Sequence, residues 1–313
     1  MKDPNDREDW NSLALDRTTL HAAKPLLGET DKTDEFTLEL LQLGWRFDDP
    51  IDLYVIRPVG PKNPPVILYL YSYPSESRRF QNHAFCQRLT RGGFAAVGFV
   101  SALTGQRYHD RPMKEWFVSE LQESLVKSVH DVQMILDYLT SRGDLDMDHV
   151  GMFGQGSGGT IAILAAAVDP RIKALNLVDP WGDWPDWMAQ SKLVPEVERA
   201  NYLAPQFQRH IAPFDPIQWL PKLASRPIRI QGMADDLVTP VICQKKIEAA
   251  ASPNSTEIVH YATRPEMIEA TADGKVFDWL KSQLQPESKQ QTTQPPSESH
   301  ADVTRKANVG EDR

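Results

Sequence analysis

A glycine-rich turn near the middle of the chain carries the residues with the clearest potential for chemistry. The stretch GMFGQGSGGTIAIL, residues 151–164, has the pattern of a strand, a tight turn and an alanine-rich helix. Such a turn can present a serine nucleophile in a G-x-S-x-G pattern, or hold the phosphates of a dinucleotide in a G-x-G-x-x-G pattern. Ser157 is the serine of this turn. Its place in the turn decides which chemistry the chain can perform.

The dinucleotide pattern fits this turn by its letters. Its three glycines fall on Gly154, Gly156 and Gly159, and the acidic Asp179 follows about 20 residues later. That fingerprint normally follows the first strand of a sheet, whereas this turn lies in the middle of the chain. The sequence therefore favours the nucleophile pattern and predicts no cofactor, with dinucleotide binding kept as the weaker alternative.

The segments around the turn alternate between short apolar runs and helical patterns. Leu121, Leu125, Val129 and Val132 recur at helical spacing within a helix expected over 116–139. The expected strands are 52–58, 66–71, 95–101, 149–153, 174–179, 227–232 and 256–261. This alternation predicts an α/β fold, with a mostly parallel sheet covered on both faces.

The order of these segments resembles the α/β-hydrolase superfamily, in the branch of dienelactone-hydrolase-like, acetyl-esterase-like and prolyl-oligopeptidase-like domains. The resemblance covers roughly residues 50–284. It is carried by the helix at 116–139 and by the phrases MDHVGMFGQGSGG, AAAVDPRIKAL, IRIQGMADDLVTP and GKVFDWLKSQL. It implies a doubly wound, mostly parallel sheet and a serine nucleophile at the turn.

Within that resemblance, the nucleophile's position falls on a glycine. The strand is expected to end at Phe153, so Gly154 and Gly158 match the small residues that flank the nucleophile by two places. The residue between them is Gly156, and Ser157 comes one place late. Glycine adopts the strained backbone of such a turn at little cost, so Gly156 is what a chain freed from catalysis would carry.

The resemblance also implies an acid and a base near the turn. Asp235, in GMADDLVTP, matches the acid, and Asp236 or Asp235 could instead cap a helix that starts near Thr239. Arg264 stands where the histidine base is expected, and a guanidinium cannot accept a proton. His260 is close in sequence but falls within the preceding strand, so it is either a displaced base or an ordinary strand histidine.

An oxyanion pocket needs only backbone N–H groups. The resemblance implies one from Ser157 and one from the loop YSYPSES, where Ser72 or Tyr73 must donate because Pro74 has no N–H. His109, which follows another strand, and Trp181 are further candidates to line this pocket. No histidine shows a metal-ligand spacing, so no metal site is predicted.

Residues 180–222 insert a long aromatic segment between two expected strands. Its tryptophans are Trp181, Trp184, Trp187 and Trp219. The segment is either a small helical cap over an apolar pocket or a packed insert with a tryptophan core, and the spacing of three fits both.

The remaining segments set the domain limits. Residues 1–35 are expected to form an acidic N-terminal extension, 36–284 the hydrolase-like domain and 285–313 a disordered tail. Apolar runs such as VILYLY fall far short of the roughly 20 residues of a membrane span, and the acidic start has no signal peptide, so we expect a cytoplasmic protein. The net charge of −9 argues against a nucleic-acid partner, and Cys86 and Cys243 are expected to be free buried thiols.

Three functions follow from these observations. Two departures, Gly156 for serine and Arg264 for histidine, favour a decayed triad that binds a small acyl or ester-like ligand. The second function is an active ester hydrolase that uses Ser157, Asp235 and His260. The third is hydrolysis by a directly activated water molecule, with Asp235, Asp236 or His109 as the base.

Overall fold

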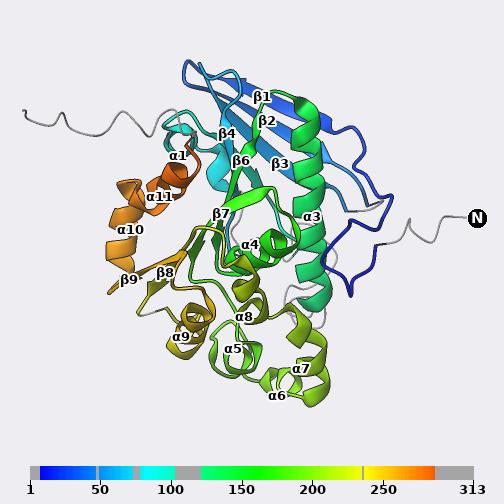
Figure 1. Cartoon of the computed structure of the whole chain (residues 1–313), viewed down its shortest axis with the longest axis vertical. Helices are drawn as coiled ribbons and strands as arrows, with labels where there is room; N and C mark the ends of the chain where they lie inside the picture. The colour runs from blue at the N-terminus through cyan, green and yellow to red at the C-terminus, as the bar shows by residue number, and fades with distance from the viewer. Residues whose placement is uncertain (1–7, 47–48, 73–77, 103–120, 235, 286–313) are drawn as a thin grey trace, which may run out of the picture.

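The computed structural model describes residues 8–46, 49–72, 78–102, 121–234 and 236–285 (Figure 1). A single sheet runs through the molecule, in the strand order β1-β2-β3-β5-β4-β6-β7-β8-β9. The strands are β1 Leu26–Lys32, β2 Phe36–Leu43, β3 Ile51–Pro58, β4 Pro65–Leu70, β5 Ala95–Phe99, β6 Asp146–Gln155, β7 Ile172–Val178, β8 Ile228–Met233 and β9 Thr256–Tyr261. The strands from β5 to β9 in this order pair in parallel, and β1, β2 and β3 pair antiparallel at one edge.

Helices cover both faces of the sheet (Figure 1). On one face lie α3 Leu121–Arg142, α4 Ser157–Val168 and α9 Val241–Ala250, and on the other lie α1 His83–Thr90, α10 Arg264–Ala272 and α11 Lys275–Gln283. The central strand β4 shows why both layers form, since its side chains alternate between the two faces. Val66, Leu68 and Leu70 join the core under α3 and α4, whereas Ile67 and Tyr69 join the core under α1 and α11.

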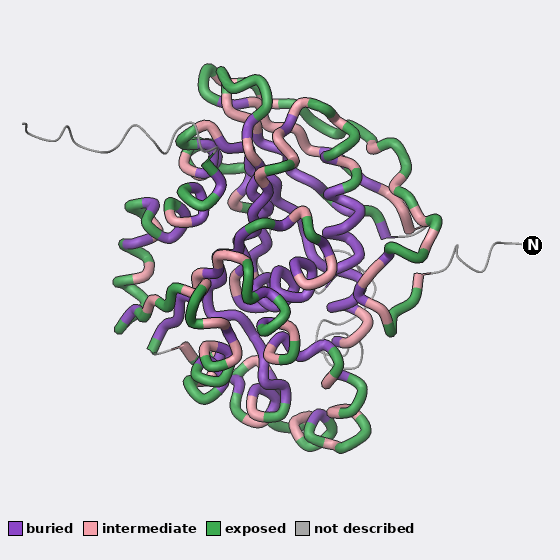
Figure 2. Tube along the Cα trace, viewed as in Figure 1, coloured by how far each residue is buried: buried purple, intermediate pink, exposed green. Residues whose placement is uncertain are grey.

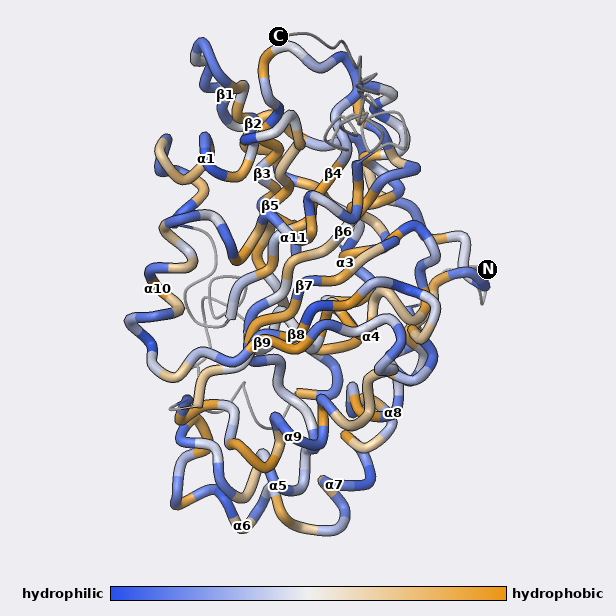
Figure 3. Tube along the Cα trace, turned by 60° about the vertical axis from the view of Figure 1, so that its left-hand side comes forward, coloured by the Kyte–Doolittle hydropathy of each residue, from blue (hydrophilic) through white to orange (hydrophobic). Residues whose placement is uncertain are grey.

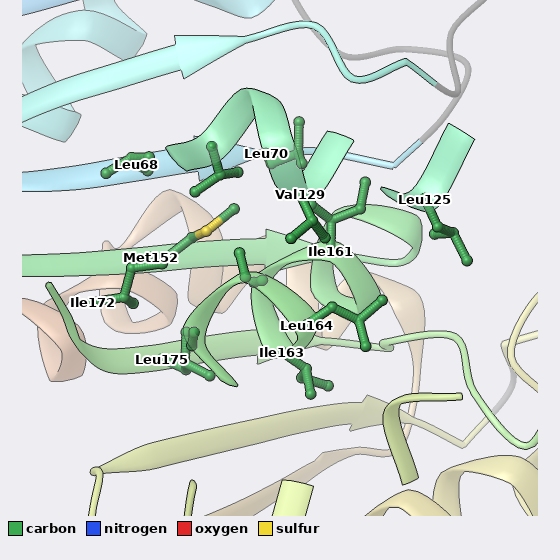
Figure 4. Packing of buried hydrophobic residues seen from close by; sticks show 14 of the residues in the cluster. Leu68, Leu70, Leu125, Val129, Met152, Ile161, Ile163, Leu164, Ile172 and Leu175 are labelled. Atoms are coloured by element: carbon green, nitrogen blue, oxygen red, sulfur yellow. The ribbon is translucent and has the colours of Figure 1, made fainter. Parts of the chain in front are cut away.

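The larger core lies between the centre of the sheet and the helices α3 and α4. Figure 4 shows Leu68 and Met152 from the sheet facing Ile161 and Leu164 of α4, with Val129 of α3 beside them. These side chains are fully buried. Buried residues concentrate on the central strands (Figure 2), and so do apolar residues (Figure 3). The outer loops are mostly exposed and polar. Apolar burial on both faces is the main stabilisation of such a sheet.

The insert between β7 and β8 is helical, as expected from its sequence. Its helices are α5 Trp184–Gln190, α6 Arg199–Tyr202, α7 Pro205–Ile211 and α8 Pro216–Trp219, with the short turns η3 Ala212–Phe214 and η4 Leu220–Leu223. Trp181, Trp184 and Trp187 are all buried, and the ring of Trp187 lies 4.9 Å from that of Trp181 and 5.8 Å from that of Trp184. Of the two alternatives, the contacts favour a packed insert with a tryptophan core.

The predicted fold class is confirmed, and each of the seven expected strands is present. Two strands were not anticipated, β1 and β2. Since β1 pairs with β2, residues 26–32 of the expected N-terminal extension are part of the sheet. Both cysteines are free and buried, as predicted. In the described part of the chain, no helix is long and apolar enough to cross a membrane. The expected tail, apart from its first residue Gln285, lies outside the described residues.

Candidate functional site

The glycine-rich turn lies where β6 passes into α4. The strand continues to Gln155, two residues beyond the expected end, because Gly154 and Gln155 still pair with β7. Gly156 then makes the turn alone, with φ 54° and ψ −119°, and α4 begins at Ser157. The backbone N–H of Gly156 donates to the carbonyl of Val178 over 2.8 Å. A backbone at positive φ strains any residue other than glycine.

The neighbouring glycines are required because backbone segments meet there. A Cβ atom on Gly154 would collide with the backbone of Gly158, and one on Gly158 would collide with the carbonyl group of Leu70. A Cβ atom on Gly159 would lie 2.8 Å from the Cβ of Pro180. These contacts explain the small residues on both sides of the turn, and they would be lost with almost any substitution.

The space in front of Gly156 is taken by two other side chains. A Cβ atom on Gly156 would lie 2.5 Å from the Oγ of Ser72 and 3.0 Å from the Nε1 of Trp181. Ser72 reaches this place because β4 pairs in parallel with β6, with Leu70 opposite Gly154. Two residues further along both segments, Ser72 therefore stands opposite Gly156. The polar groups at the turn come from its neighbours and not from the turn itself.

Ser157 is buried in the interior of the protein. It is the first residue of α4, and its exposed fraction is 0%. A nucleophile must reach its substrate and a base, so this burial weighs against the hydroxyl of Ser157 as the attacking group.

The expected acid Asp235 lies outside the described residues, but its neighbour Asp236 is resolved in detail. The carboxylate of Asp236 accepts hydrogen bonds from the backbone N–H groups of Val238 at 3.2 Å and Thr239 at 2.9 Å. Helix α9 starts only at Val241, after Pro240. The alternative in which Asp236 caps this helix does not hold, because its hydrogen bonds close the loop before the helix.

His260 lies in β9, the strand at one edge of the sheet. Its ring is 59% exposed, and its Nε2 lies 3.7 Å from the Oε1 of Glu248 on α9. Three strand spacings of roughly 4.8 Å separate β9 from β6, which is about 14 Å. These contacts do not bring His260 to Ser157.

The place of the expected histidine is the start of a helix. Arg264 is exposed and is the first residue of α10. Thr263 caps this helix by accepting a hydrogen bond from the N–H of Glu266, and the carboxylate of Glu266 accepts one from the N–H of Ala262 at 2.7 Å. These two hydrogen bonds fix the chain as the start of a helix.

The other candidate pocket residues divide into two groups. Ser72 and Trp181 lie beside Gly156, whereas Tyr73 and His109 lie outside the described residues. Hollows of about 610 Å³ and about 400 Å³ lie elsewhere, the first between β2 and the end of α3 and the second on the insert. No cluster of histidine, cysteine and acidic residues that could hold a metal ion occurs within the described ranges.

Asp179 is a buried acid close to the turn. In the sequence it was considered only as the acidic residue of the dinucleotide pattern. It is 4% exposed, follows β7 and has a positive φ of 43°. Its Oδ1 accepts a hydrogen bond from the N–H of Met233 at 2.9 Å. The carboxylate of Asp179 is thus buried and bonded to the backbone of β8. The signal in the sequence that could have indicated a buried acid near the turn is the position of Asp179 directly after an expected strand.

Comparison with known proteins agrees with this fold. The family model for X-Pro dipeptidyl-peptidases of the S15 family matches residues 49–210, just over half of the chain. The putative hydrolase YtaP of Bacillus subtilis (strain 168) is 26% identical over 168 residues, 48% of this chain and 56% of that protein. The match thus spans little more than half of this relative's length.

Solved structures show the same architecture at low sequence identity. An acetyl xylan esterase from Paenibacillus sp. R4 superimposes with a TM-score of 0.62 at 15% identity, over 88% of this chain and 92% of its own. The acylaminoacyl peptidase of Pyrococcus horikoshii superimposes with a TM-score of 0.59 at 13% identity, over 85% of this chain and 50% of its own. The chain therefore belongs to the X-Pro dipeptidyl-peptidase (S15) family, within the α/β-hydrolase superfamily.

Proposed function

We propose that this chain binds a small acyl or ester-like ligand at the turn around Gly156 and does not carry out classical serine-hydrolase catalysis. The observation that carries the proposal is the backbone of Gly156, the single residue between β6 and α4, which has φ 54° and ψ −119°. In related hydrolases a turn of this kind presents the nucleophile. With glycine at this place, the turn offers no hydroxyl to attack an acyl carbon.

The absence of a base at the expected place supports the same proposal. Arg264 begins a capped helix, and a guanidinium stays protonated at any working pH. His260 lies beside Glu248 on the surface. A serine hydroxyl without a base within hydrogen-bond reach is a weak nucleophile.

The ligand class is inferred from the relatives and from the fold. Structural neighbours are named as esterases and peptidases, which act on acyl groups. Open α/β sheets bind ligands beyond the carboxyl ends of their strands, which is where the turn lies. A small acyl compound therefore fits this site better than a nucleic acid or a metal ion.

Catalysis is tested with a panel of short-chain p-nitrophenyl esters and a fluorophosphonate probe whose adducts are mapped by peptide mass spectrometry. We expect no turnover and no labelling. The alternative function, an esterase that uses Ser157, Asp235 and His260, predicts stoichiometric labelling of Ser157 and turnover that Ser157→Ala abolishes. Ser282→Ala, a change of an exposed serine on α11, is the matched control. Turnover without labelling would instead support direct attack by water.

Binding is tested by ligand-observed NMR with methyl butyrate and butyrate. We expect at least one of them to bind the wild-type chain, and we expect Gly156→Ala to weaken this binding, because the added methyl group would displace Ser72 and Trp181 from their places beside the turn. Gly143→Ala is the control, since it also changes a glycine at positive φ, yet nothing lies within 4 Å of its Cβ position. Equal binding by both variants would place the ligand elsewhere.

A further inference from the structure

The hollow of about 610 Å³ lies at the opposite end of the sheet from the glycine-rich turn. It is enclosed by the chain before β1, by β2 and by the last turns of α3, and α3 runs beside β1 and β2 (Figure 1). Strand β6 begins at Asp146, shortly after α3 ends at Arg142, and reaches Gln155 beside the turn. Its ten residues span roughly 30 Å at about 3.3 Å per residue. The hollow is therefore separate from the site proposed at Gly156.

Residues 21–25, here called the strap, form one wall of the hollow and are held on both sides. Before the strap, the buried side chain of Gln133 on α3 donates a hydrogen bond to the carbonyl of Leu13 at 2.8 Å. Within the strap, the N–H of Ala23 donates to the carbonyl of Gly44 at 2.7 Å. After the strap, β1 pairs with β2. Because these contacts fix the wall, the hollow is a preformed feature of the fold, and its volume lies in the range of about 300–1,000 Å³ that is typical of small-molecule sites.

Much of the lining of the hollow is apolar. Leu41 of β2 is buried in the larger core, and Ala22 and Tyr138 are partly buried and pack against that core. Pro25 and Leu27 add apolar surface at the rim, where Leu27 is 60% exposed. An apolar ligand that covered these side chains would remove their surface from water, which is favourable.

The charged groups of the lining leave one cation without a partner. The carboxylate of Glu39 lies 2.8 Å from the guanidinium of Arg142, and the carboxylate of Asp137 lies 2.6 Å from that of Arg171. Lys24 of the strap is exposed and forms no ion pair with any residue that the structure describes. Since both acids of the lining are neutralised by arginines, the ammonium group of Lys24 is available to an anion.

The hydroxyl of Tyr138 is a second donor in the lining. Its oxygen accepts a hydrogen bond from Arg142 at 3.0 Å, and its O–H has no acceptor within the described ranges. A phenol can accept and donate at the same time. An ammonium group and a hydroxyl donor beside an apolar surface fit a carboxylate that is carried on an apolar chain.

We propose that this hollow is a second binding site, for an amphipathic carboxylate such as a medium-chain fatty acid. The carboxylate is held by Lys24 and by the hydroxyl of Tyr138, and the apolar chain covers Leu41 and Ala22. This site goes beyond the function proposed at the turn and does not depend on it.

Octanoate is the probe, and 1-octanol is its uncharged counterpart. Both are titrated into the full chain with ¹³C-labelled methyl groups, and NMR shift changes locate each compound. We expect octanoate to shift the methyl signals of Ala22, Leu27 and Leu41 at the hollow, and to leave those of Leu70 and Ile161 near the turn unchanged.

Three variants test the lining. Lys24→Gln removes the charge, Tyr138→Phe removes the hydroxyl, and Ala23→Trp fills the hollow from an exposed position on the strap. Matched controls are Lys32→Gln on β1 and Ala249→Trp on α9, since both positions are exposed and neither lines the hollow. Melting temperatures report whether each variant is folded.

We expect Lys24→Gln and Tyr138→Phe each to raise the dissociation constant of octanoate about three- to tenfold, as for the loss of one polar contact beside solvent. Ala23→Trp should raise it by more than about tenfold, because the indole occupies the place of the apolar chain. The controls should stay within about twofold of the wild-type chain. Lys24→Gln should leave the weaker binding of 1-octanol unchanged. If Ala23→Trp does not fold, the variants at Lys24 and Tyr138 decide the outcome.

Three results would overturn the proposal. The first is no shift change at Ala22, Leu27 and Leu41. The second is wild-type affinity for octanoate in folded Lys24→Gln and Tyr138→Phe. The third is an equal loss of octanoate and 1-octanol in Lys24→Gln, since the charge would then play no part. Shift changes confined to Leu70 and Ile161 would also exclude the hollow, while they would support ligand binding at the turn.

Discussion

Placing a serine back at the turn is the most direct test of how Gly156 is built into the fold. In Gly156→Ser the new side chain would take up the position that a nucleophile occupies in related hydrolases. We expect the variant to be less stable than the wild-type chain. Two physical costs act together, the backbone strain at φ 54° and the steric overlap with Ser72 and Trp181.

The magnitude follows from these two costs. A non-glycine residue in such a backbone conformation costs on the order of 1–3 kcal/mol. Forcing a side chain into a filled space costs about 1–3 kcal/mol more, and here the Cβ atom would lie 2.5 Å from the Ser72 Oγ. We therefore expect a loss of about 2–6 kcal/mol, which corresponds to a fall of roughly 5–20 °C in melting temperature.

The two costs can be separated by matched variants. Gly143→Ala introduces a side chain at φ 72° with nothing within 4 Å, so it reports strain alone, at about 1–2 kcal/mol. The double variant Gly156→Ser/Ser72→Gly removes one of the colliding groups and should recover part of the loss. Urea denaturation and thermal melting are measured for the wild-type chain, Gly156→Ser, Ser72→Gly and the double variant. Analysed as a double-mutant cycle, these measurements give the coupling between positions 156 and 72.

A melting temperature of Gly156→Ser equal to or above that of the wild-type chain would refute this reasoning. It would mean that the turn accepts a side chain without strain or overlap. The interpretation that glycine has replaced the nucleophile at position 156 would then have no structural basis. If Gly156→Ser loses the full expected stability and Ser72→Gly does not restore any of it, the cost comes from the backbone strain and from the overlap with Trp181.

Two further predictions concern stability. Trp187→Ala should cost about 3–5 kcal/mol in urea denaturation, because the ring is fully buried, whereas Trp219→Ala should cost clearly less, because the ring is partly exposed beneath Lys222; equal losses would contradict a tryptophan core. Burial raises the pKa of Glu8, but hydrogen bonds and charges from Arg46 and His130 outweigh it and lower the pKa from 4.5 to about 2. A lowered carboxyl pKa stabilises the fold above about pH 4.5, and this stabilisation is lost as the pH falls through 2. The difference in unfolding free energy between the wild-type chain and Glu8→Gln, on the order of 3 kcal/mol at neutral pH, should shrink between pH 5 and pH 2, and a constant difference would contradict the prediction.

The fold was largely predictable because its central strands are apolar on both faces. Runs such as VILYLY can be accommodated only between two covering layers, so β4 and its neighbours were found from sequence alone. The strand β1, LLGETDK, was missed because it is an exposed edge strand with charged side chains, which read as a polar extension. Its pairing with β2 depends on contacts between strands and not on its own pattern.

The turn itself was also predictable, since only glycine satisfies its close backbone contacts. The sequence determined that Gly154, Gly156 and Gly158 make a strand-turn-helix corner, because local steric limits are encoded residue by residue. It could not determine what fills the space in front of Gly156.

Tertiary structure alone decided that point. Ser72 and Trp181 reach Gly156 from two other strand ends, and their convergence depends on the parallel register of β4, β6 and β7. The same register leaves His260 on the far side of β8, beside Glu248. Contacts between segments distant in the chain arise only when the sheet is assembled, so no local pattern of residues can specify them.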